Sequence, residues 1–457
     1  MLDIVVLAAG KGTRMKSSLP KVLHPLAGKP LLSHVLDTAQ LLGEKDQGQC
    51  ELHVVIGHGA ELIQQSIDNN KFHYSLQTEQ LGTGHAVQQV MENLRSDAIT
   101  LILYGDVPLI QEETLEKLIT LVDDETMGLL TIELDDPSGY GRIIKDAQGS
   151  VRAIVEQKDA TADQLAVCEV NTGVMAVKGS HLKEWLPQLS NDNAQNEYYL
   201  TDIIAIARKN GIDVVNATPQ NEMEVLGVNN RRQQAELERY LQENIAQQLM
   251  DEGVTLLDPY RFDCRGDLQA GEDLVIDVNC VFEGLVKIGN NVSIGPNVCI
   301  SNTTIGDNVV IKANSVLEDA VLGNNCDVGP FARLRPGTVL SDKAKVGNFV
   351  ETKKALVGEG SKINHLSYIG DTTIGKGANI GAGTITCNYD GVNKFKTEIG
   401  DGAFIGSNSA LVAPVSIGKN ATVGAGSTLT KNLGDNELAV ARGKQKNISH
   451  WERPVKK

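Results

Sequence analysis

The sequence predicts an α/β domain with a mixed, mostly parallel sheet, followed by a helix and a solenoid of parallel β-coils. Three observations predict this architecture. In the first half, short apolar runs alternate with helical patterns, as in folds with a mainly parallel sheet. In the second half, an aliphatic residue followed by a small or polar residue recurs every six positions. Between the halves lies a polar helical pattern with a narrow apolar stripe.

The period of six runs from about Cys264 to Leu429, with several register slips of one residue. Neither a helix, with period 3.6, nor an isolated strand, with period 2, produces this spacing. Stacked β-coils do, because each short strand points one aliphatic side chain inward and the small residue after it lets the chain turn. The repeated positions include Ile276, Phe282, Ile288, Ile294, Ile300, Ile305, Ile311, Leu317, Leu322, Val328, Leu334, Leu340, Val346, Val357, Ile363, Ile369, Ile374, Ile380, Ile399, Ile405, Leu411, Ile417, Val423 and Leu429.

The repeat is interrupted between Ile385 and Ile399, where Thr386–Lys396 contains no hexad. A polar excursion from a rigid solenoid commonly carries binding residues, because the coils fix its ends and its side chains stay accessible. Length variation without a role is the alternative.

In the first half, apolar runs predict strands and helical periodicity predicts helices at defined positions. The predicted strands are Ile4–Leu7, Leu52–Ile56, Ile99–Tyr104, Leu129–Leu134, Gly141–Lys145, Val151–Glu156, Val174–Val177 and Asp213–Ala217, and the predicted helices are Leu31–Leu42 and Gly84–Leu94. The segment Gly43–Cys50 is expected to be a surface loop.

Asn230–Glu252 carries leucine or isoleucine at intervals of four and is followed by Gly253, which predicts a solvated helix about 33 Å long. We therefore expect a first domain over 1–229, a linker helix over 230–252, a hexapeptide-repeat domain over 253–437 and a tail over 438–457. The tail from Arg442 is basic and contains Trp451. It is either a disordered end or an arm that contacts a neighbouring subunit.

The formal net charge of -16 argues against nucleic acid or an anionic membrane as a partner, so a phosphate-bearing ligand would need local cations. The seven cysteines show no metal-ligand spacing, which predicts free thiols, most of them in the core, in a reducing cytoplasm. The N-terminal apolar run Ile4–Ala9 is too short for a signal peptide, and no stretch approaches the length of a membrane span.

The strongest local motif is Leu7-Ala8-Ala9-Gly10-Lys11-Gly12-Thr13-Arg14-Met15, followed by Pro20-Lys21. A strand leads into small residues whose backbone N–H groups can approach a phosphate or a base edge, and three cations accompany them. The motif matches neither the Walker loop nor the dinucleotide fingerprint. Phosphate binding and an ordinary glycine-rich turn both remain open.

Two single residues could carry chemistry. Asp106 follows the buried strand that ends at Tyr104-Gly105, where ligands of open α/β sheets bind. It could hold a metal over a triphosphate or cap a turn, and the nearby basic loop favours the metal, since phosphoryl transfer uses both. His365 is the only histidine within the hexads. It is either a general base, as imidazoles titrate near neutral pH, or a hydrogen-bonded structural residue.

Several motifs together resemble known families. Leu7–Met15 with Lys21, Gln80–Ala86, Tyr104–Pro108 and Gly139–Arg142 resemble the sugar-nucleotide pyrophosphorylases. With the hexads and the loop Cys387-Asn388-Tyr389-Asp390-Gly391, the chain resembles the bacterial bifunctional N-acetylglucosamine-1-phosphate uridyltransferase and glucosamine-1-phosphate acetyltransferase family along nearly its whole length. The departures are small: Asn196 and Thr352 stand where we expect a glycine and an aliphatic residue.

For the first half, the resemblance implies uridylyl transfer from UTP to N-acetylglucosamine 1-phosphate, with release of pyrophosphate. It implies catalytic roles for Arg14 and Lys21 at the phosphates, and Mg²⁺ held by Asp106 and Asn229. The implied nucleotide- and sugar-binding residues are Leu7, Ala8, Ala9, Gly10, Lys21, Gln77, Gly82, Thr83, Tyr104, Gly105, Asp106, Gly141, Glu156, Asn171 and Asn229.

For the second half, the resemblance implies acetyl transfer from acetyl-CoA to glucosamine 1-phosphate on a left-handed, trimeric β-helix, with His365 as the general base. The implied sugar-phosphate ligands are Arg335, Lys353, Tyr368, Asn379 and Lys394. The implied acetyl-CoA contacts are Ala382, Asn388, Tyr389, Ser407, Ala425 and Arg442. We also hypothesise that Glu351 orients His365. The alternatives are a uridyltransferase whose β-helix is a non-catalytic trimerisation or regulatory module, and a non-catalytic sugar-nucleotide sensor.

Overall fold

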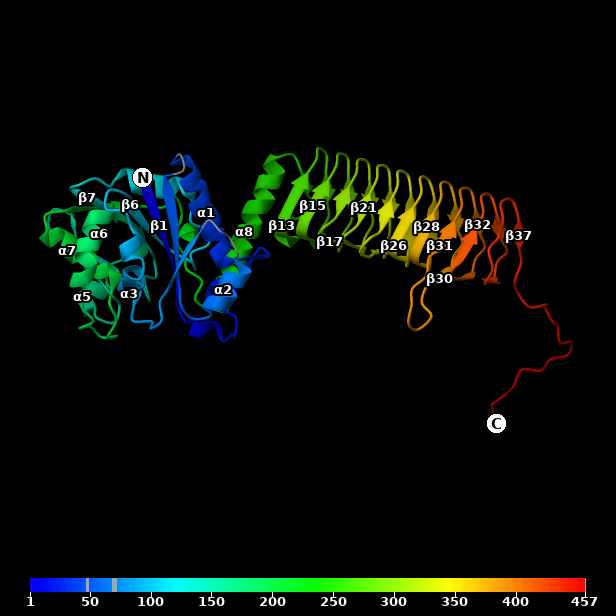
Figure 1. Ribbon diagram of the computed structural model, residues 1–457, viewed down its shortest axis with the longest axis horizontal. Coiled ribbons are helices and arrows are strands. Elements are labelled where there is room, and N and C mark those ends of the chain that lie inside the picture. Colours follow the sequence, from blue (N-terminus) through cyan, green and yellow to red (C-terminus); the bar gives the residue numbers. More distant parts are fainter. Residues whose placement is uncertain (47–48, 68–71, 457) are drawn as a thin grey trace. The chain divides into compact units, whose positions relative to one another are not determined.

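The computed structural model describes residues 1–46, 49–67 and 72–456, and it divides the chain into two compact units, Met1–Leu241 and Gln242–Lys457. The boundary falls within helix α8 (Arg231–Asp251), which lies one residue inside each predicted end of the linker helix. Figure 1 shows the α/β elements of the first unit and the repeated coils of the second.

The first unit is built on a mixed sheet with the strand order β11-β7-β10-β6-β1-β4-β5. β1 pairs in parallel with β4 and β6, whereas β10 runs antiparallel to β6 and β7. β8 and β9 form an antiparallel pair at the side of β10. The strands are β1 (Leu2–Ala8), β4 (Cys50–Ile56), β5 (His73–Leu76), β6 (Ile99–Tyr104), β7 (Thr126–Glu133), β8 (Arg142–Lys145), β9 (Val151–Val155), β10 (Glu169–Lys178) and β11 (Asp213–Ala217), and a small hairpin joins β2 (Pro25–Leu26) to β3 (Lys29–Pro30).

Helices cover both faces of this sheet, which is why β1 is buried along its whole length. Side chains of α1, α2 and α4 pack on one face, and side chains of α3, α6 and α7 pack on the other. The helices are α1 (Leu31–Lys45), α2 (Ala60–Ser66), α3 (Thr83–Gln88), α4 (Glu112–Thr120), α5 (Ala162–Leu165), α6 (Gly179–Trp185) and α7 (Ile203–Lys209). The sheet topology confirms the predicted mixed α/β class.

Two predictions in this unit need correction at their C-terminal ends. α1 continues to Lys45 where a loop was expected from Gly43, because Leu42 and Gly43 are buried in the helix; residues 47–48 of that expected loop lie outside the described residues. The helix predicted to reach Leu94 ends at Gln88, and a 3-10 turn over Met91–Asn93 follows. This turn still buries Leu94, so the apolar spacing is satisfied without one continuous helix.

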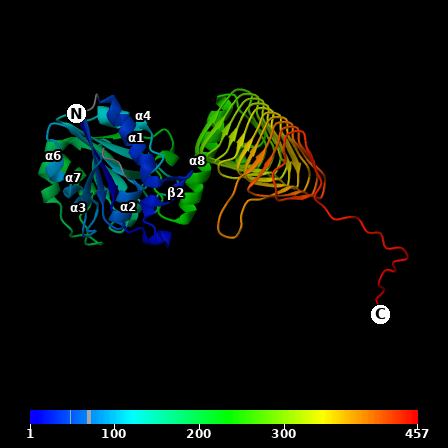
Figure 2. The ribbon, with the colours of Figure 1, turned by 45° about the vertical axis from the view of Figure 1, so that its right-hand side comes forward.

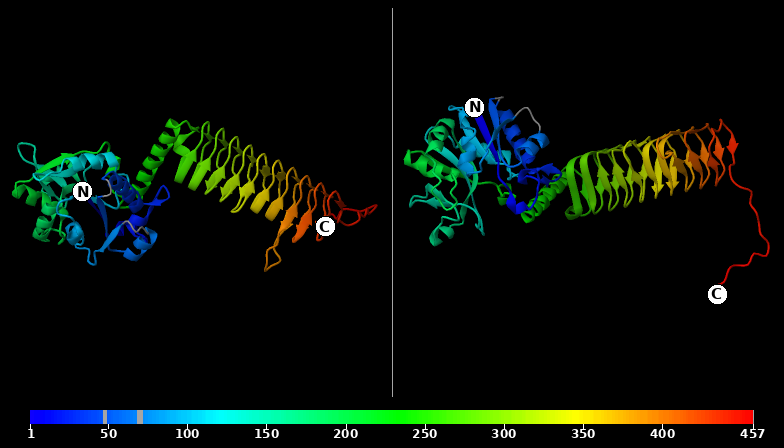
Figure 3. Two further views of the ribbon diagram at one scale, coloured as in Figure 1. Left: turned by 45° about the horizontal axis from the view of Figure 1, so that its top comes forward. Right: turned by 60° about the horizontal axis from the view of Figure 1, so that its bottom comes forward.

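The second unit is a left-handed parallel β-helix, which Figures 2 and 3 show as successive coils stacked along one axis. One face is a parallel sheet with the order β12-β14-β16-β19-β22-β25-β27-β29-β32-β35-β37, and the other two faces share a second parallel sheet. The strands are β12 (Thr255–Leu256), β13 (Phe262–Ala270), β14 (Val275–Ile276), β15 (Cys280–Ile288), β16 (Ser293–Ile294), β17 (Cys299–Ser301), β18 (Thr304–Ile305), β19 (Val310–Ile311), β20 (Val316–Glu318), β21 (Val321–Leu322), β22 (Asp327–Val328), β23 (Arg333–Leu334), β24 (Val339–Leu340), β25 (Lys345–Asn348), β26 (Glu351–Val357), β27 (Lys362–His365), β28 (Tyr368–Ile374), β29 (Asn379–Ile380), β30 (Ile385–Cys387), β31 (Thr397–Ile399), β32 (Phe404–Ile405), β33 (Ala410–Val412), β34 (Val415–Ile417), β35 (Thr422–Val423), β36 (Thr428–Leu429) and β37 (Leu438–Ala439).

Every aliphatic hexad position predicted from the sequence is buried in one continuous core. Two inward positions are threonines: Thr352 is 0% exposed and Thr386 is 1% exposed. Thr352 Oγ1 lies 3.0 Å from Thr338 Oγ1, and Thr386 Oγ1 accepts a hydrogen bond of 2.8 Å from Gly370 N. The repeat therefore continues through both threonines, and the excursion begins after Thr386 rather than at it.

The last strand, β37, pairs with β35, so the solenoid continues past residue 437. Beyond it, the described tail is exposed and contains neither helix nor strand (Figure 1). The cysteines are free thiols, but only Cys264, Cys280 and Cys326 are buried, so the expectation that most are core residues was wrong. None of the described helices is both long and apolar enough to cross a bilayer.

Candidate functional sites

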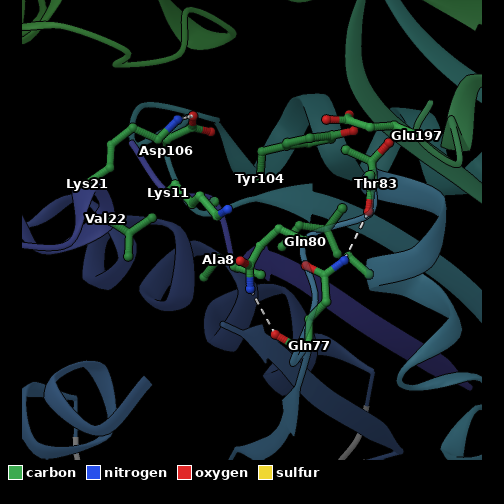
Figure 4. A pocket seen from close by; sticks show the side chains of 15 residues that line it. Ala8, Lys11, Lys21, Val22, Gln77, Gln80, Thr83, Tyr104, Asp106 and Glu197 are labelled. Carbon is green, nitrogen blue, oxygen red and sulfur yellow. Dashed lines mark hydrogen bonds and ion pairs between the residues drawn. The ribbon is translucent and has the colours of Figure 1, made fainter. Parts of the chain in front are cut away.

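The loop after β1 lines a pocket of about 430 Å³ in the first unit. Figure 4 shows Lys21 and Asp106 on one side of this pocket and Thr83 and Glu197 on the other. A neighbouring pocket of about 690 Å³ shares Lys11, Lys21 and Glu197 with it. The first pocket is also lined by Leu7, Ala8, Ala9, Gly10, Val22, Gln77, Gln80, Gly82, Ala86 and Tyr104, and the second by Gly12, Thr13, Arg14, Gly139, Glu156, Gln157, Lys158, Gln195 and Asn229.

Two side-chain oxygens, from Asp106 and Asn229, converge on the Lys21 ammonium where these pockets meet. The Lys21 ammonium pairs with the Asp106 carboxylate and donates a hydrogen bond of 3.1 Å to Asn229 Oδ1. Arg14 Nη2 donates to the same amide oxygen at 2.9 Å. A carboxylate and an amide oxygen around one positive centre form a donor set that suits a hard divalent cation.

The residues present therefore fit such a cation. In the part of the chain that the structure describes, no three His, Cys, Asp or Glu side chains gather into a metal-binding group. Asp106 and Asn229 would accordingly supply two ligands, and substrate phosphates and water would supply the others. Magnesium is usually bound in this way, through one or two protein oxygens plus phosphates.

The opposite side of the pocket is fixed by hydrogen bonds around Gln77, which is 3% exposed. Its Nε2 donates to Gly82 O at 3.1 Å and lies 3.1 Å from His85 Nδ1. Gly82 has a φ of +109°, and a Cβ there would lie 2.6 Å from Tyr198 O, so only glycine fits. Thr83 Oγ1 accepts a hydrogen bond from the backbone N–H of residue 200. These contacts hold Gln77, Gly82 and Thr83, three of the predicted nucleotide- and sugar-binding residues, close together.

Gly141, Glu156 and Asn171, for which the family resemblance implies contacts to the sugar, are neighbours. Asn171 N donates to Gly141 O at 2.9 Å, and a Cβ at Gly141 would lie 3.3 Å from Glu156 Oε1. Burial raises the pKa of Glu156, and the hydrogen bond from Thr201 Oγ1, 3.2 Å long, opposes that rise. Tyr104 packs against Gly173, and burial raises the pKa of its hydroxyl, which keeps the group protonated.

In the second unit, His365 ends β27 and its imidazole is exposed. Nδ1 lies 2.7 Å from Oδ1 of Asn348, the residue opposite it in β25. Within this chain the Glu351 carboxylate pairs with Arg335 at 2.7 Å, so Asn348, and not the hypothesised Glu351, contacts the His365 imidazole here. The contact to the imidazole comes from Asn348 in β25, one coil below His365, and not from β26, which carries Glu351.

Four predicted acetyl-CoA contacts continue in a line from His365. Backbone N–H groups bond to carbonyls one coil below: Gly383 N to His365 O, Asn408 N to Ala382 O, and Gly426 N to Ser407 O. Arg442 Nη1 extends the line by donating to Ala425 O at 2.8 Å. Neighbouring coils lie about 4.8 Å apart, so Ala425 is about 14 Å from His365 along the stack.

Four of the five predicted sugar-phosphate ligands, Arg335, Lys353, Tyr368 and Lys394, lie away from the face that carries His365. A close contact with the Lys394 amino group, together with the charge of Arg335, lowers the pKa of Lys353. Tyr368 in β28 is the register partner of Glu351 in β26, and Glu351 pairs with Arg335. Asn379 instead lies on the face of the β-helix that carries His365. His365 and Gly370, the register partner of Lys353, are five positions apart in the chain, at most about 16 Å if that segment were fully extended. Within the described residues, no hydrogen bond or ion pair joins His365 to these cations.

The excursion projects from the stack (Figure 1), but Asn388, the residue that follows β30, is only 7% exposed. Asn388 Nδ2 donates to Asp371 Oδ2 at 2.5 Å. A Cβ at Gly370 would lie 2.5 Å from Tyr368 Oη and 2.8 Å from Asn388 Nδ2. Gly370 therefore allows two predicted ligand contacts to meet, while Tyr389 stays exposed on the excursion.

Some residues at these sites were missed from the sequence. Asn348 could have been found by stepping back one coil, seventeen residues, from His365. Thr201 and Glu197 approach the pocket only through tertiary folding, and no local signal marks them. Asn196, where a glycine was expected, has a φ of +54°, which asparagine tolerates better than most residues.

Family models of known proteins match segments of both units. The family model of the MobA-like NTP transferase domain matches residues 4–139, and that of the bacterial transferase hexapeptide (six repeats) matches residues 396–431. A third, the GMPPB C-terminal domain, matches residues 265–357. Three curated relatives named "Bifunctional protein GlmU" align over the whole chain: those of Saccharophagus degradans (64% identical, 100% of each chain), Cellvibrio japonicus (62%, 100% of each) and Marinobacter nauticus (60%, 100% of this chain and 99% of that one).

The chain belongs to the GlmU family. The resemblance predicted from the motifs is thereby confirmed, with the nucleotidyltransferase match in the first unit and the hexapeptide match in the second. Among solved structures, a nucleotidyl transferase from Methanothermobacter thermautotroptrophicus is similar at 16% identity and a TM-score of 0.39, covering 53% of this chain and 99% of that one.

Proposed function

We propose that this member of the GlmU family makes UDP-N-acetylglucosamine in two steps. The β-helix, expected over 253–437 and continued by β37 (Leu438–Ala439), transfers acetyl from acetyl-CoA to glucosamine 1-phosphate. The α/β domain, over 1–229, then transfers uridylyl from UTP to N-acetylglucosamine 1-phosphate. One observation supports the proposal: the same chain has a pocket in which a carboxylate and an amide oxygen meet one ammonium group, and an exposed imidazole at the head of a line of small residues.

In the uridylyl step, the sugar phosphate attacks the α-phosphorus of UTP, and the bond to the β-phosphate oxygen breaks to release pyrophosphate. The nucleophile is already anionic, so the protein needs no general base and contributes mainly positioning and charge neutralisation. The proposed ligands are Leu7–Gly10, Gln77, Gly82 and Thr83 for uridine, Arg14 and Lys21 for the phosphates, and Gly141, Glu156 and Asn171 for the sugar. Mg²⁺ on Asp106 and Asn229 would neutralise phosphate charge when bound.

In the acetyl step, the amine of glucosamine 1-phosphate attacks the thioester carbonyl of acetyl-CoA. His365 accepts the amine proton at Nε2, and CoA leaves as the sulfur–carbon bond breaks. The line of small residues through Ala382, Ser407 and Ala425 offers an unobstructed track for the extended arm of the cofactor. Arg442 at its end suits the phosphates, and Asn388 and Tyr389 would contact the same ligand.

We further propose that the acetyl-transfer site is shared between subunits of a homotrimer. In one chain the cations that would hold the sugar phosphate lie across a face of the β-helix from His365, so a neighbouring copy must bring them together. The corner beside His365 also carries an exposed apolar group: Phe331 and Phe349 stack at 5.1 Å between ring centroids, and Leu366 is 62% exposed. A neighbouring subunit would cover these side chains. Sedimentation equilibrium giving a monomeric mass would contradict the shared site.

Acetyl-CoA as the acyl donor, Mg²⁺ as the cation and a cytoplasmic location are further parts of this proposal, and the sequence resemblance supports them. The test is to assay both half-reactions on the purified chain. Pyrophosphate release from UTP should require N-acetylglucosamine 1-phosphate and a divalent cation. CoA thiol release should require glucosamine 1-phosphate. Pyrophosphate without CoA would favour the alternative of a non-catalytic β-helix, and neither product would favour a sugar-nucleotide sensor.

A further inference from the structure

We propose that Asn348 is the positioning residue for acetyl transfer, holding the His365 imidazole in the tautomer whose Nε2 accepts the proton. This inference rests on the proposed acetyl transfer. The observation that carries it is the contact of 2.7 Å between Asn348 Oδ1 and His365 Nδ1.

The backbone around this contact is held in place on both strands. Asn348 and His365 are register partners in β25 and β27. A Cβ at Gly347, the residue before Asn348, would lie 1.9 Å from the carbonyl oxygen of Asn364, so the two coils approach closely only because position 347 is glycine. Ser367 Oγ donates to His365 O at 2.9 Å and fixes the other side of the histidine. The pair therefore has a defined geometry rather than a chance surface contact.

The contact determines which nitrogen can act as the base. An amide oxygen only accepts, so His365 Nδ1 must carry its proton and Nε2 keeps its lone pair. After Nε2 takes a proton, the same amide oxygen still accepts from Nδ1 and stabilises the imidazolium without adding a charge. Removing Asn348 would leave the ring free to rotate and to exchange tautomers.

Several charged side chains lie near the Asn348–His365 pair. A groove of about 250 Å³ beside Asn348 and His365 is also lined by Lys312, Asp327 and Lys345, and Lys312 pairs with Asp327 at 2.7 Å. On the strand that follows β25, Glu351 is engaged with Arg335. Asn348 is thus the group that the described structure places in hydrogen-bond contact with the imidazole, and it is neutral.

The test uses three full-length variants. Asn348→Ala removes the acceptor, Asn348→Asp replaces it with a charged acceptor, and Asn364→Ala is a matched control, one residue before His365, that leaves the contact intact. Each is assayed for CoA release across pH 5.5–9 and for uridylyl transfer, which reports that the chain is folded. Thermal unfolding of each variant completes the set.

We expect Asn348→Ala to lower kcat for acetyl transfer by about 10- to 100-fold with little change in either KM, a loss typical of removing the partner of a functional histidine. Asn348→Asp should restore part of the rate and move the acid limb of the kcat/KM profile to higher pH by about one unit or more, because a carboxylate stabilises the imidazolium. Asn364→Ala should behave as wild type, and uridylyl transfer should not change.

Equal acetyl-transfer rates in Asn348→Ala and wild type would overturn the inference. So would a loss of rate in Asn348→Asp with an unmoved acid limb, because that is the result of a merely structural contact. A wild-type chain that releases no CoA would instead refute the proposed acetyl transfer itself, so the two failures are distinguishable.

Discussion

Replacing Asp106 with alanine removes the acidic side chain that, among the described residues, pairs with Lys21 beside Asn229. If Asp106 and Asn229 hold the divalent cation, the variant keeps one amide ligand and loses the charged one. The uridylyl step should fail while the acetyl step, on the other compact unit, should proceed.

The size of the loss follows from the site's partial burial. The Asp106 side chain is 16% exposed, so an effective dielectric constant near 20 is appropriate. Two unit charges about 4 Å apart then attract by about 4 kcal/mol. Because each 1.4 kcal/mol is a factor of ten, kcat for uridylyl transfer should fall by about 10³-fold.

The assay measures pyrophosphate and CoA release on the same preparation. The control is Asp124→Ala, which removes a carboxylate that is 90% exposed in the same unit and should change neither rate. Uridylyl transfer within tenfold of wild type, or loss of both activities from folded Asp106→Ala protein, would refute the reasoning.

Three further predictions concern other parts of the chain. In the proposed acetyl-transfer site, Lys394→Ala would remove a charge-assisted contact to the sugar phosphate, so it should raise KM for glucosamine 1-phosphate by about tenfold or more without affecting uridylyl transfer. The control variant Lys376→Ala, at an exposed lysine, should change neither quantity. Ile363→Ala, at a fully buried hexad position, should lower the free energy of unfolding by about 2–5 kcal/mol in denaturant titrations, and a loss below about 1 kcal/mol would contradict the stacked core. His53 is 2% exposed, neither ring nitrogen has a partner among the described residues, and burial lowers its pKa below 6.5. The folded state therefore resists protonation of His53, so thermal stability should be full above about pH 6.5 and should decline as the pH falls below that value. The decline of the melting temperature with falling pH should be less steep in His53→Leu, and equal declines in the two proteins would refute this role.

The sequence predicted the elements whose signals are local. Two strands, Ile99–Tyr104 and Asp213–Ala217, have the predicted bounds because each is a short run with turn residues on both sides. The hexads predicted the core of the β-helix because every coil repeats the same inward position. Thr352 was noted only as a departure from an expected aliphatic residue, and Thr386 was not recognised in the repeat, since a search for aliphatic side chains overlooks a hydroxyl that is buried and hydrogen-bonded.

Contacts between coils were beyond what the sequence alone showed. Glu351 was chosen as the partner of His365 from proximity to Lys353 in the chain, but strand geometry directs it to Arg335. Asn348 is seventeen residues from His365 and meets it only because two coils stack in register. The first unit's oxygen pair, Asp106 and Asn229, came from the family resemblance and not from spacing, since the two residues meet only through the fold.

The most direct test of two catalytic sites on one chain is product stoichiometry. Purified wild-type protein is given glucosamine 1-phosphate, acetyl-CoA, UTP and Mg²⁺, and CoA, pyrophosphate and UDP-N-acetylglucosamine are quantified together. We predict one CoA and one pyrophosphate for each UDP-N-acetylglucosamine once the intermediate has reached a steady level. Formation of UDP-N-acetylglucosamine only when N-acetylglucosamine 1-phosphate is supplied, with no CoA released, would contradict the account.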